Sequence, residues 1–395
     1  MNVPKIRFKE FKDEWKKEKF SQFSYNSGKR NKDNLNLVPY AITNTFGFVP
    51  QNEAHNEFGY MKDTDRKAYN IVTKNSFAYN PARINVGSIG YYSDNEDIIV
   101  SSLYEVFKTR DYINDKFIWY WLKSDKFPKW INKLQEGSVR QYFYYDKLCE
   151  TPVYLPSLNE QEKISNTLEL LDKKIELQLK KIEDLKLFKK GLSNDLINDI
   201  NEYKELSLKD IGTTYSGLSG KSKEDFENGN SKFISFMSVL KDKIEIDNLP
   251  TVTINNDEKQ NKVQKYDLFF NTSSETKEEV ALCSTINKDI DNLYLNSFCF
   301  GYRINDLKLV NNEYLNMMLH CTNYRKLISN FGQGFTRVNI SKNELMDLIV
   351  KVPSMNEQIK IVDIINKVKN IIELESTKLS KLQELKKGLM QNMFV

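Results

Sequence analysis

A long internal repeat is the feature that most constrains this chain of 395 residues. The segment VYLPSLNEQEKI begins at Val153, and the closely similar VKVPSMNEQIKI begins at Val350. Without a gap, residues 153–197 are identical to residues 350–394 at 17 of 45 positions. Self-similarity over such a length indicates that one structural element is used twice.

The same register of 197 residues continues upstream of the repeat, in the pairs Gly137/Gly334 and Arg140/Arg337. The segments before that, roughly 20–110 and 212–305, look unrelated to each other. We therefore expect four domains or regions: a first variable unit, a long helix, a second variable unit and a second long helix, with the boundaries 1–152, 153–200, 201–349 and 350–395.

Each copy of the repeat opens with proline followed by Ser-x-x-Glu, in the pairs Ser157/Glu160 and Ser354/Glu357. This spacing is typical of a capping box, in which the serine hydroxyl and the glutamate carboxylate satisfy free amide groups of the first helical turn. A helix is expected to start at each site.

Steps of four and three residues after each start visit mainly apolar side chains, which is the heptad pattern of a coiled coil. Each stripe has nine positions with two polar exceptions at equivalent steps: Ile164, Leu168, Leu171, Ile175, Gln178, Ile182, Leu185, Lys189 and Leu192, and then Ile361, Ile365, Val368, Ile372, Glu375, Leu379, Leu382, Lys386 and Leu389. The polar steps are candidates for setting the register of the pair.

A helix over 157–199 would be about 64 Å long at about 1.5 Å per residue, too long to bury its stripe within a small domain. We expect the second copy to be its antiparallel partner, related by an internal pseudo-twofold axis. The predicted fold is α+β, with two mixed α/β units separated by this coiled coil. The alternative is that each helix is only the last element of its own domain.

Short apolar runs in the variable units predict strands, which makes each unit a mixture of helices and strands. The runs are 75–79, 98–107, 266–270 and 298–304, and Asn, Asp and Gly separate them. The aromatic stretch Phe117–Leu122 and its counterpart Tyr314–Leu319 are expected to form buried helices, because the second copy stays apolar with fewer rings.

The net charge of +4 does not by itself require a nucleic-acid partner. Residues 1–152 carry 24 Lys and Arg against 19 Asp and Glu, whereas residues 201–349 carry 18 against 21. If both units bind DNA, the second must use a local basic surface, because its net charge of −3 would repel phosphates.

The motif search gives no catalytic or metal site. Gly217–Ser222 resembles a phosphate-binding loop but has Tyr215 where that motif needs glycine. Asn80-Pro81-Ala82-Arg83 lacks the second proline and the aromatic residue of an amino-group methylation motif. Four scattered cysteines and two histidines support neither a zinc site nor a disulfide framework.

The candidate DNA contacts are basic residues beside glycines or in the variable loops. An arginine follows a glycine by three residues in both units, where a turn could present it to phosphates or to guanine; the alternative is an arginine paired with a nearby carboxylate. The full set of candidates is Lys29, Arg30, Lys32, Arg83, Arg140, Lys221, Lys223 and Arg337.

The whole chain resembles the specificity subunit of type I restriction-modification systems. The resemblance is carried by the Pro-Ser-x-Asn-Glu-Gln helix starts at 156–161 and 353–358, and by Lys-Gly-Leu at 190–192 and 387–389. It implies that each variable unit is a target-recognition domain reading one half of an asymmetric, bipartite double-stranded DNA sequence. The helices would set the spacer between the halves.

The resemblance also implies that the chain is not an enzyme and binds no cofactor. Two methyltransferase subunits, which use S-adenosylmethionine, would dock on it, and restriction subunits would use ATP and Mg²⁺. No apolar run could span a membrane and the N-terminus lacks a signal peptide, so a cytoplasmic location is expected. Two alternatives stay open: a coiled-coil adaptor without DNA specificity, and the recognition part of a stand-alone DNA-modifying enzyme.

Overall fold

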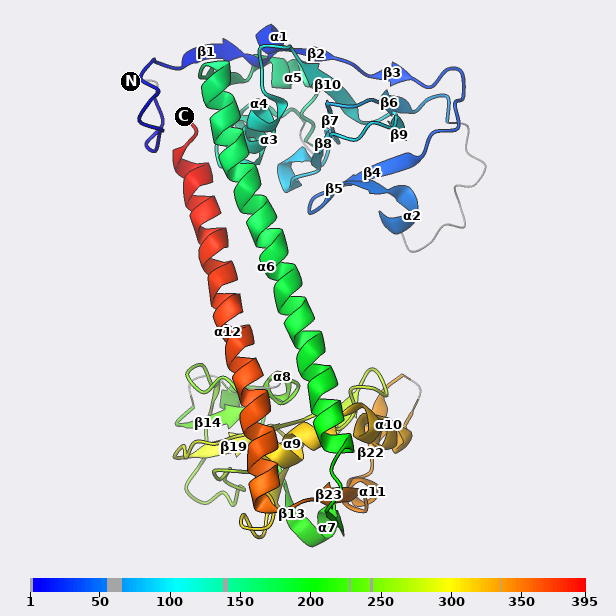
Figure 1. Cartoon of the computed structure of the whole chain (residues 1–395), viewed down its shortest axis with the longest axis vertical. Coiled ribbons are helices and arrows are strands. Elements are labelled where there is room, and N and C mark those ends of the chain that lie inside the picture. The colour runs from blue at the N-terminus through cyan, green and yellow to red at the C-terminus, as the bar shows by residue number, and fades with distance from the viewer. Residues whose placement is uncertain (1–2, 55–65, 138–140, 227–228, 242–243, 335) are drawn as a thin grey trace. The chain divides into compact units, whose positions relative to one another are not determined.

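The computed structural model describes residues 3–54, 66–137, 141–226, 229–241, 244–334 and 336–395. The chain forms two compact units. Unit 1 consists of Met1–Leu179 and Thr377–Val395, and unit 2 consists of Lys180–Ser376. Each unit therefore contains one globular region together with about half of each long helix, α6 (Leu158–Asn198) and α12 (Met355–Asn392) (Figure 1).

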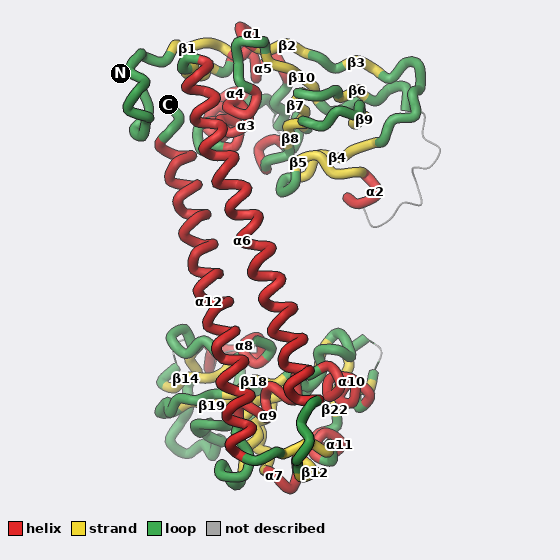
Figure 2. Tube along the Cα trace, viewed as in Figure 1, coloured by secondary structure: helices red, strands yellow, loops and turns green. Residues whose placement is uncertain are grey.

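The two long helices confirm the elements that the repeat predicted, with 41 residues in α6 and 38 in α12. Figure 2 shows both as unbroken helices. In unit 1, the start of α6 and the end of α12 share one hydrophobic cluster, which includes Leu168 and Met390. In unit 2 the end of α6 shares a cluster with the start of α12, including Ile197 and Ile365. Within each unit the helices are therefore paired in opposite directions.

Ion pairs occupy the polar steps of the second heptad stripe. In unit 1, Lys386 of α12 donates to the carboxylate of Asp172 in α6. In unit 2, the Lys181 ammonium of α6 lies 3.0 Å from the carboxylate of Glu375, which is buried in α12. Since a buried charge needs its partner opposite, these pairs favour one register of the two helices.

The helix starts agree only in part with the predicted capping boxes. At the start of α12, the Ser354 hydroxyl accepts a hydrogen bond from the amide of Glu357 at 3.3 Å. At the start of α6, however, the Glu160 carboxylate accepts two hydrogen bonds from the Arg7 guanidinium, at 2.7 and 2.8 Å. The Glu160 carboxylate thus binds the N-terminal segment, which supplies a charged partner, and its capping role stays a prediction.

The glutamine of each helix start connects the long helix to the globular region in the same way. Gln161 accepts from the amide of Asn114 at 2.9 Å, and Gln358 accepts from the amide of Asn311 at 2.8 Å. Both glutamines also donate to the carbonyl of the proline five residues earlier. Each asparagine in turn caps the next helix, α3 (Asp115–Lys123) or α9 (Asn312–His320).

The globular region of unit 1 has a two-stranded, a four-stranded and a five-stranded sheet with short helices around them. The four-stranded sheet has the order β2-β10-β7-β8, and the five-stranded sheet has the order β3-β6-β9-β4-β5. The elements are β1 (Lys16–Lys19), α1 (Phe20–Phe23), β2 (Ser24–Asn26), β3 (Lys29–Arg30), β4 (Pro39–Thr43), β5 (Gly47–Pro50), α2 (Gln51–Ala54), β6 (Asn70–Val72), β7 (Ser76–Tyr79), η1 (Ile84–Val86), β8 (Ile89–Tyr92), β9 (Ile98–Val100), β10 (Glu105–Thr109), α3, α4 (Phe127–Leu134), α5 (Tyr145–Glu150) and β11 (Pro152–Leu155).

Unit 2 has a two-stranded sheet, a four-stranded sheet of order β13-β20-β16-β18 and two three-stranded sheets, β15-β14-β19 and β17-β22-β21. Its elements are β12 (Lys204–Ser207), α7 (Leu208–Ile211), β13 (Gly212–Ser216), η2 (Lys223–Phe226), β14 (Ser231–Ile234), α8 (Phe236–Val239), β15 (Thr251–Val252), β16 (Leu268–Asn271), β17 (Ser273–Ser274), β18 (Cys283–Thr285), β19 (Leu293–Leu295), β20 (Cys299–Ile304), α9, α10 (Thr322–Asn330), β21 (Gly332–Gln333), β22 (Val338–Ile340), α11 (Lys342–Met346) and β23 (Ile349–Val352).

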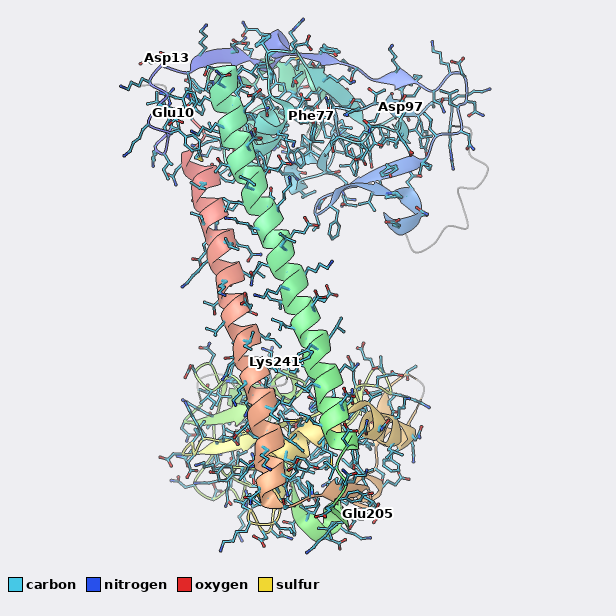
Figure 3. All side chains as sticks on the ribbon, in the orientation of Figure 1. Glu10, Asp13, Phe77, Asp97, Glu205 and Lys241 are labelled. Atoms are coloured by element: carbon cyan, nitrogen blue, oxygen red, sulfur yellow. The ribbon has the colours of Figure 1, made fainter. Side chains whose placement is uncertain are left out.

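The variable segments share one scaffold despite their dissimilar sequences. In both units an antiparallel pair joins the first strand to the strand before the long helix, β1 to β11 and β12 to β23. The four-stranded sheets also correspond, and each has a stacked ring pair between equivalent strands. Phe77 and Phe107 lie 4.9 Å apart, and Phe270 and Phe300 lie 5.2 Å apart. Figure 3 labels Phe77 among the unit 1 strands.

Most predicted strands and buried helices are confirmed. The segments 75–79 and 298–304 contain β7 and β20, and the segment 266–270 overlaps β16. The two apolar stretches lie in α3 and α9, whose buried residues include Trp121 and Leu315. The run 98–107 is wrong as a single strand. It divides into β9 and β10, which lie in different sheets, because the chain turns at Ser101, whose carbonyl accepts from the Tyr104 amide.

No helix among the residues that the structure describes is both long and apolar enough to cross a membrane.

Candidate nucleic-acid interface

The glycine of each predicted turn has a backbone that favours glycine alone. Gly137 in unit 1 and Gly334 in unit 2 both have φ +116°, in the region that residues with a side chain rarely adopt. At Gly334 an added Cβ would lie 2.2 Å from the carbonyl oxygen of Arg337. The turn in unit 2 thus closes against the backbone of its arginine, which places that arginine at the start of β22.

Arg337 is exposed in unit 2 and lies beside an exposed ring. Its Nε donates to the Ser273 hydroxyl at 3.1 Å, and its guanidinium carbon lies 5.9 Å from the ring centroid of Phe298, which is 57% exposed. Among the residues that the structure describes, no carboxylate is paired with Arg337. The predicted alternative of a carboxylate partner is thus not seen there, and the guanidinium keeps donors for an incoming phosphate or base.

The corresponding turn of unit 1 is described only around its edges, and Arg140 lies outside the described residues. Glu136 and Tyr142 form a β-bridge that brackets the turn, with N–H···O distances of 2.9 and 2.7 Å. The rings of Tyr142 and Tyr144 stack with their centroids 5.5 Å apart, and Tyr144 is 46% exposed. A stacked aromatic pair therefore begins at the bridge residue Tyr142.

The first basic loop of unit 1 lies at the edge of the five-stranded sheet. Lys29 and Arg30 form β3, which pairs with β6, and Lys32 follows in the next turn. All three residues are exposed. The Arg30 guanidinium donates to the carbonyls of Ala68 at 2.6 Å and Ser102 at 3.3 Å, so the sheet holds it in place. The edge thus presents three exposed cations, of which Arg30 is held by hydrogen bonds to the backbone.

Arg83 is exposed at the start of the short helix η1, after a turn that its neighbours stabilise. The Asn80 side chain accepts from the amide of Ala82 at 3.0 Å, and the Pro81 carbonyl accepts from the amide of Phe143 at 3.1 Å. The asparagine oxygen thus stabilises a turn, and the Pro81–Phe143 hydrogen bond connects this turn to the segment that follows Arg140. This hydrogen bonding gives the Asn-Pro pair a structural role.

Lys221 is not the open cation that the sequence predicted, and we remove it from the candidate DNA contacts. Its side chain is only 5% exposed, and its ammonium lies 2.6 Å from Glu258 and 3.9 Å from Asp225. The hydrogen bond from Lys221 lowers the pKa of the Glu258 carboxyl to about 2. Lys223, two residues later at the start of η2, is exposed and stays a candidate.

The loop that resembles a phosphate-binding motif is packed against protein groups. A Cβ at Gly217 would lie 2.1 Å from the Asn296 carbonyl oxygen, and Gln260 bonds both the amide and the carbonyl of Ser219. The glycine is thus explained by close backbone packing. Across the parts of the chain that the structure describes, no cluster of three His, Cys, Asp or Glu side chains could hold a metal ion.

Sequence reasoning missed the exposed aromatic residues near the basic turns. Phe298 lies beside Arg337, and Phe46 is 81% exposed at the tip of the β4–β5 hairpin. Their positions beside turn residues were the only indication in the sequence. Phe46 stands directly before Gly47, and Phe298 comes two residues after Asn296 and directly before a strand. Exposed rings of this kind can contact thymine methyls or base faces.

The sequence matches the family of the type I restriction modification DNA specificity domain twice, at residues 9–187 and 200–384. The two matches together cover most of the chain, and each contains one globular region with its long helix. The chain therefore belongs to this family of DNA specificity proteins.

Relatives and solved structures agree with this membership. The type I restriction enzyme MjaVIII specificity subunit of Methanocaldococcus jannaschii is 30% identical over 103 residues, which are 26% of this chain and 24% of that relative. The aligned segment thus spans about a quarter of the relative's length.

Three solved structures share the fold at 16% sequence identity. The type I restriction-modification S subunit from M. genitalium has a TM-score of 0.54 and covers 100% of this chain and 99% of its own. A chain from work on complex assembly and conformational transition of the type I R-M system scores 0.63, covering 95% and 96%. The HsdS subunit from Thermoanaerobacter tengcongensis scores 0.51, covering 95% of each chain. The two units and long helices of this chain thus have the fold of type I specificity subunits.

Proposed function

We propose that this chain reads an asymmetric, bipartite DNA target and supplies that specificity to a type I restriction-modification complex. In this proposal the globular regions of units 1 and 2 each contact one half-site. The observation that carries the proposal is that both units repeat one turn, in which a glycine with the same φ is followed three residues later by an arginine. The two turns stand on the same scaffold, whereas the other loops of the two units differ in sequence. A shared frame with different loops suits two different half-sites.

The candidate contacts divide by chemistry. Lys29, Lys32 and Lys223 suit phosphates, because an ammonium on a flexible stem acts as a point charge. Arg337 suits guanine or a phosphate, because a guanidinium donates two parallel hydrogen bonds. The local cations of unit 2 offset the net charge of −3 of residues 201–349, which would otherwise repel the DNA phosphates.

The partners belong to the same proposal. Two methyltransferase subunits, which bind S-adenosylmethionine, would dock on the chain and methylate adenine in each half-site. Restriction subunits with ATP and Mg²⁺ would add cleavage of unmethylated DNA, and the chain itself would bind none of these cofactors. The paired helices would set the number of base pairs between the half-sites, because the number of residues in a stiff helix fixes its length.

Exchange of residues 200–349 for those of another specificity subunit tests the proposal. Methylome sequencing of a host with the hybrid should show one half of the methylated sequence changed and the other half retained. The reciprocal exchange of residues 1–152 is the matched control, and it should change the opposite half. An unchanged motif in both hybrids would refute two independent readers.

A coiled-coil adaptor is the second candidate, and the net charge of unit 2 favours it. An adaptor would give no sequence preference in a salt-dependent gel shift with the methyltransferase partner present. The third candidate, a stand-alone DNA-modifying enzyme, requires that the purified chain modify DNA alone. Incubation of the chain with DNA, S-adenosylmethionine and Mg²⁺ separates it from the other two.

A further inference from the structure

A pocket of about 790 Å³ lies within unit 2, between α9, the end of α6 and the start of α12. These three helices are in direct contact around it. Asn366 of α12 donates to Glu313 of α9 at 2.9 Å, and the Cys321 thiol at the C-terminal cap of α9 donates to the Ser193 carbonyl of α6 at 3.5 Å. The volume is in the range of small-molecule sites.

The pocket combines an apolar lining with a basic rim. Met317, Ile286 and Ile365 are among its apolar residues. Lys186 and Lys190 of α6 and Lys288 of the loop after β18 contribute ammonium groups. The lining also contains Lys189, Lys369, Glu313 and Glu373, so its lysines outnumber its acidic residues by five to two. The pocket thus suits a ligand with a flat or apolar body and an anionic end.

Asn316 gives the pocket a specific hydrogen-bonding requirement. The residue lines the pocket and is 6% exposed, and its Oδ1 has no hydrogen-bond partner. A buried carbonyl oxygen without a donor is unfavourable unless a ligand or an ordered water supplies one. A ligand N–H group at this point would satisfy it, which a purely apolar ligand could not do.

The internal repeat shows that this hollow is not a necessary product of the scaffold. At the register of 197 residues, Asn316 and Met317 correspond to Trp119 and Tyr120 in unit 1. There the Tyr120 hydroxyl donates to Asp172 at 2.7 Å, and the Lys123 ammonium lies 4.6 Å from the Trp119 ring centroid. Unit 1 thus places two large rings where unit 2 has two smaller side chains.

We propose that this pocket binds a small anion of nucleotide-like chemistry: a heterocycle whose N–H group donates to Asn316 Oδ1, joined to a phosphate held by Lys186, Lys190 and Lys288. The heterocycle lies against Met317 and the isoleucines. The site is separate from the Gly217–Ser222 loop and from the candidate DNA contacts. It does not depend on whether the chain reads DNA.

Titration of the full chain with adenosine 5′-monophosphate tests the site, followed by calorimetry and by ¹³C-methyl methionine NMR. Saturable binding should shift the Met317 methyl resonance, which Met317→Leu identifies. Adenosine alone and inorganic phosphate alone should each bind at least tenfold more weakly. Equal binding of phosphate alone, equal binding of adenosine alone, or no binding of the nucleotide at millimolar concentration would each overturn the proposal.

Variants assign the binding to named groups. Asn316→Trp copies unit 1 and should abolish binding, and Asn316→Leu, which is close to isosteric and easier to accommodate, should weaken it at least tenfold. Lys190→Gln should weaken it about fivefold, whereas Lys174→Gln, the same change on the part of α6 in unit 1, should leave it unchanged. Full affinity in a folded Asn316→Leu protein would overturn the assignment.

Discussion

Arg337 takes its position from a turn that only glycine can form. Any other residue at position 334 would strain the backbone, because φ is +116° and an added Cβ would lie 2.2 Å from the Arg337 carbonyl oxygen. The side chain of Arg337, in contrast, donates to the Ser273 hydroxyl and has an exposed guanidinium. The turn and its arginine can therefore be tested separately.

Arg337→Ala should weaken binding of the target duplex about tenfold while the melting temperature stays within about 2 °C, since one bidentate contact is worth about 1–3 kcal/mol. Fluorescence anisotropy with the methyltransferase partner measures the affinity on target and on random DNA. Lys308→Ala, an exposed change in the same unit, is the control. A collapse of the melting temperature would instead make Arg337 a structural residue.

The Lys221–Glu258 pair gives a pH-dependent contribution to stability. The folded pKa of Glu258 is lowered from 4.5 to about 2, mainly by the hydrogen bond from Lys221. A lowered carboxyl pKa stabilises the folded state above the unfolded pKa, and this contribution is lost as the pH falls from about 4.5 toward 2. The difference in melting temperature between the wild type and Lys221→Met should therefore be constant from pH 5 to 7.

Below pH 5 the same difference should narrow, and calorimetry from pH 5 to 3 measures it. Lys223→Met is the matched control, since its ammonium is exposed and two residues away. A difference that stays constant down to pH 3 would mean that Lys221 contributes through packing of its stem and not through its charge.

At the scale of elements, the heptad stripes are held in register by ion pairs as well as apolar contacts. Lys181→Ala removes the ammonium that lies 3.0 Å from the buried Glu375 carboxylate in unit 2. We expect a loss of about 1 kcal/mol in the free energy of unfolding, a modest value because Lys181 is half exposed. Urea unfolding measures it, with the exposed neighbour Lys180→Ala as control. Equal effects of both changes would contradict a specific pair.

The long helices were predictable because local rules act at every turn of them. Proline, serine and the heptad stripe indicate the start and the partner without distant information. The Arg7–Glu160 pair joins residues 153 positions apart, and no local pattern indicates it. Lys221 could not be predicted for the same reason. Its partner Glu258 lies 37 positions away, and the pairing buries the side chain of a lysine that stands in a basic loop.

The shared scaffold of the variable segments could not be predicted from the sequence for a related reason. A buried strand needs apolar residues but no particular sequence, so Phe77 with Phe107 and Phe270 with Phe300 occupy equivalent places in unlike sequences. The site was predictable where glycine requires a positive φ, at 137 and 334. The exposed rings of Phe46 and Phe298 were not, because an aromatic residue in a strand-rich segment normally indicates core.

For the whole molecule, the proposed role of the helices as a spacer predicts a measurable change in the DNA target. One heptad adds about 10 Å to a helix, which corresponds to about three base pairs, and it turns the following residues by only about 20°. We expect a duplicated heptad in both helices, after Leu179 in α6 and after Thr377 in α12, to lengthen the unread spacer by about three base pairs. Both half-sites should stay the same.

Methylome sequencing of a host with this double insertion measures the spacer directly. An insertion in α6 alone is the control, because it shifts one heptad stripe against the other and should abolish methylation together with the cooperative unfolding of the pair. Retention of the original spacer in the double insertion would show that something other than the helices sets the separation. A changed half-site would show that the helices also take part in reading bases, which the division into two readers and one spacer does not allow.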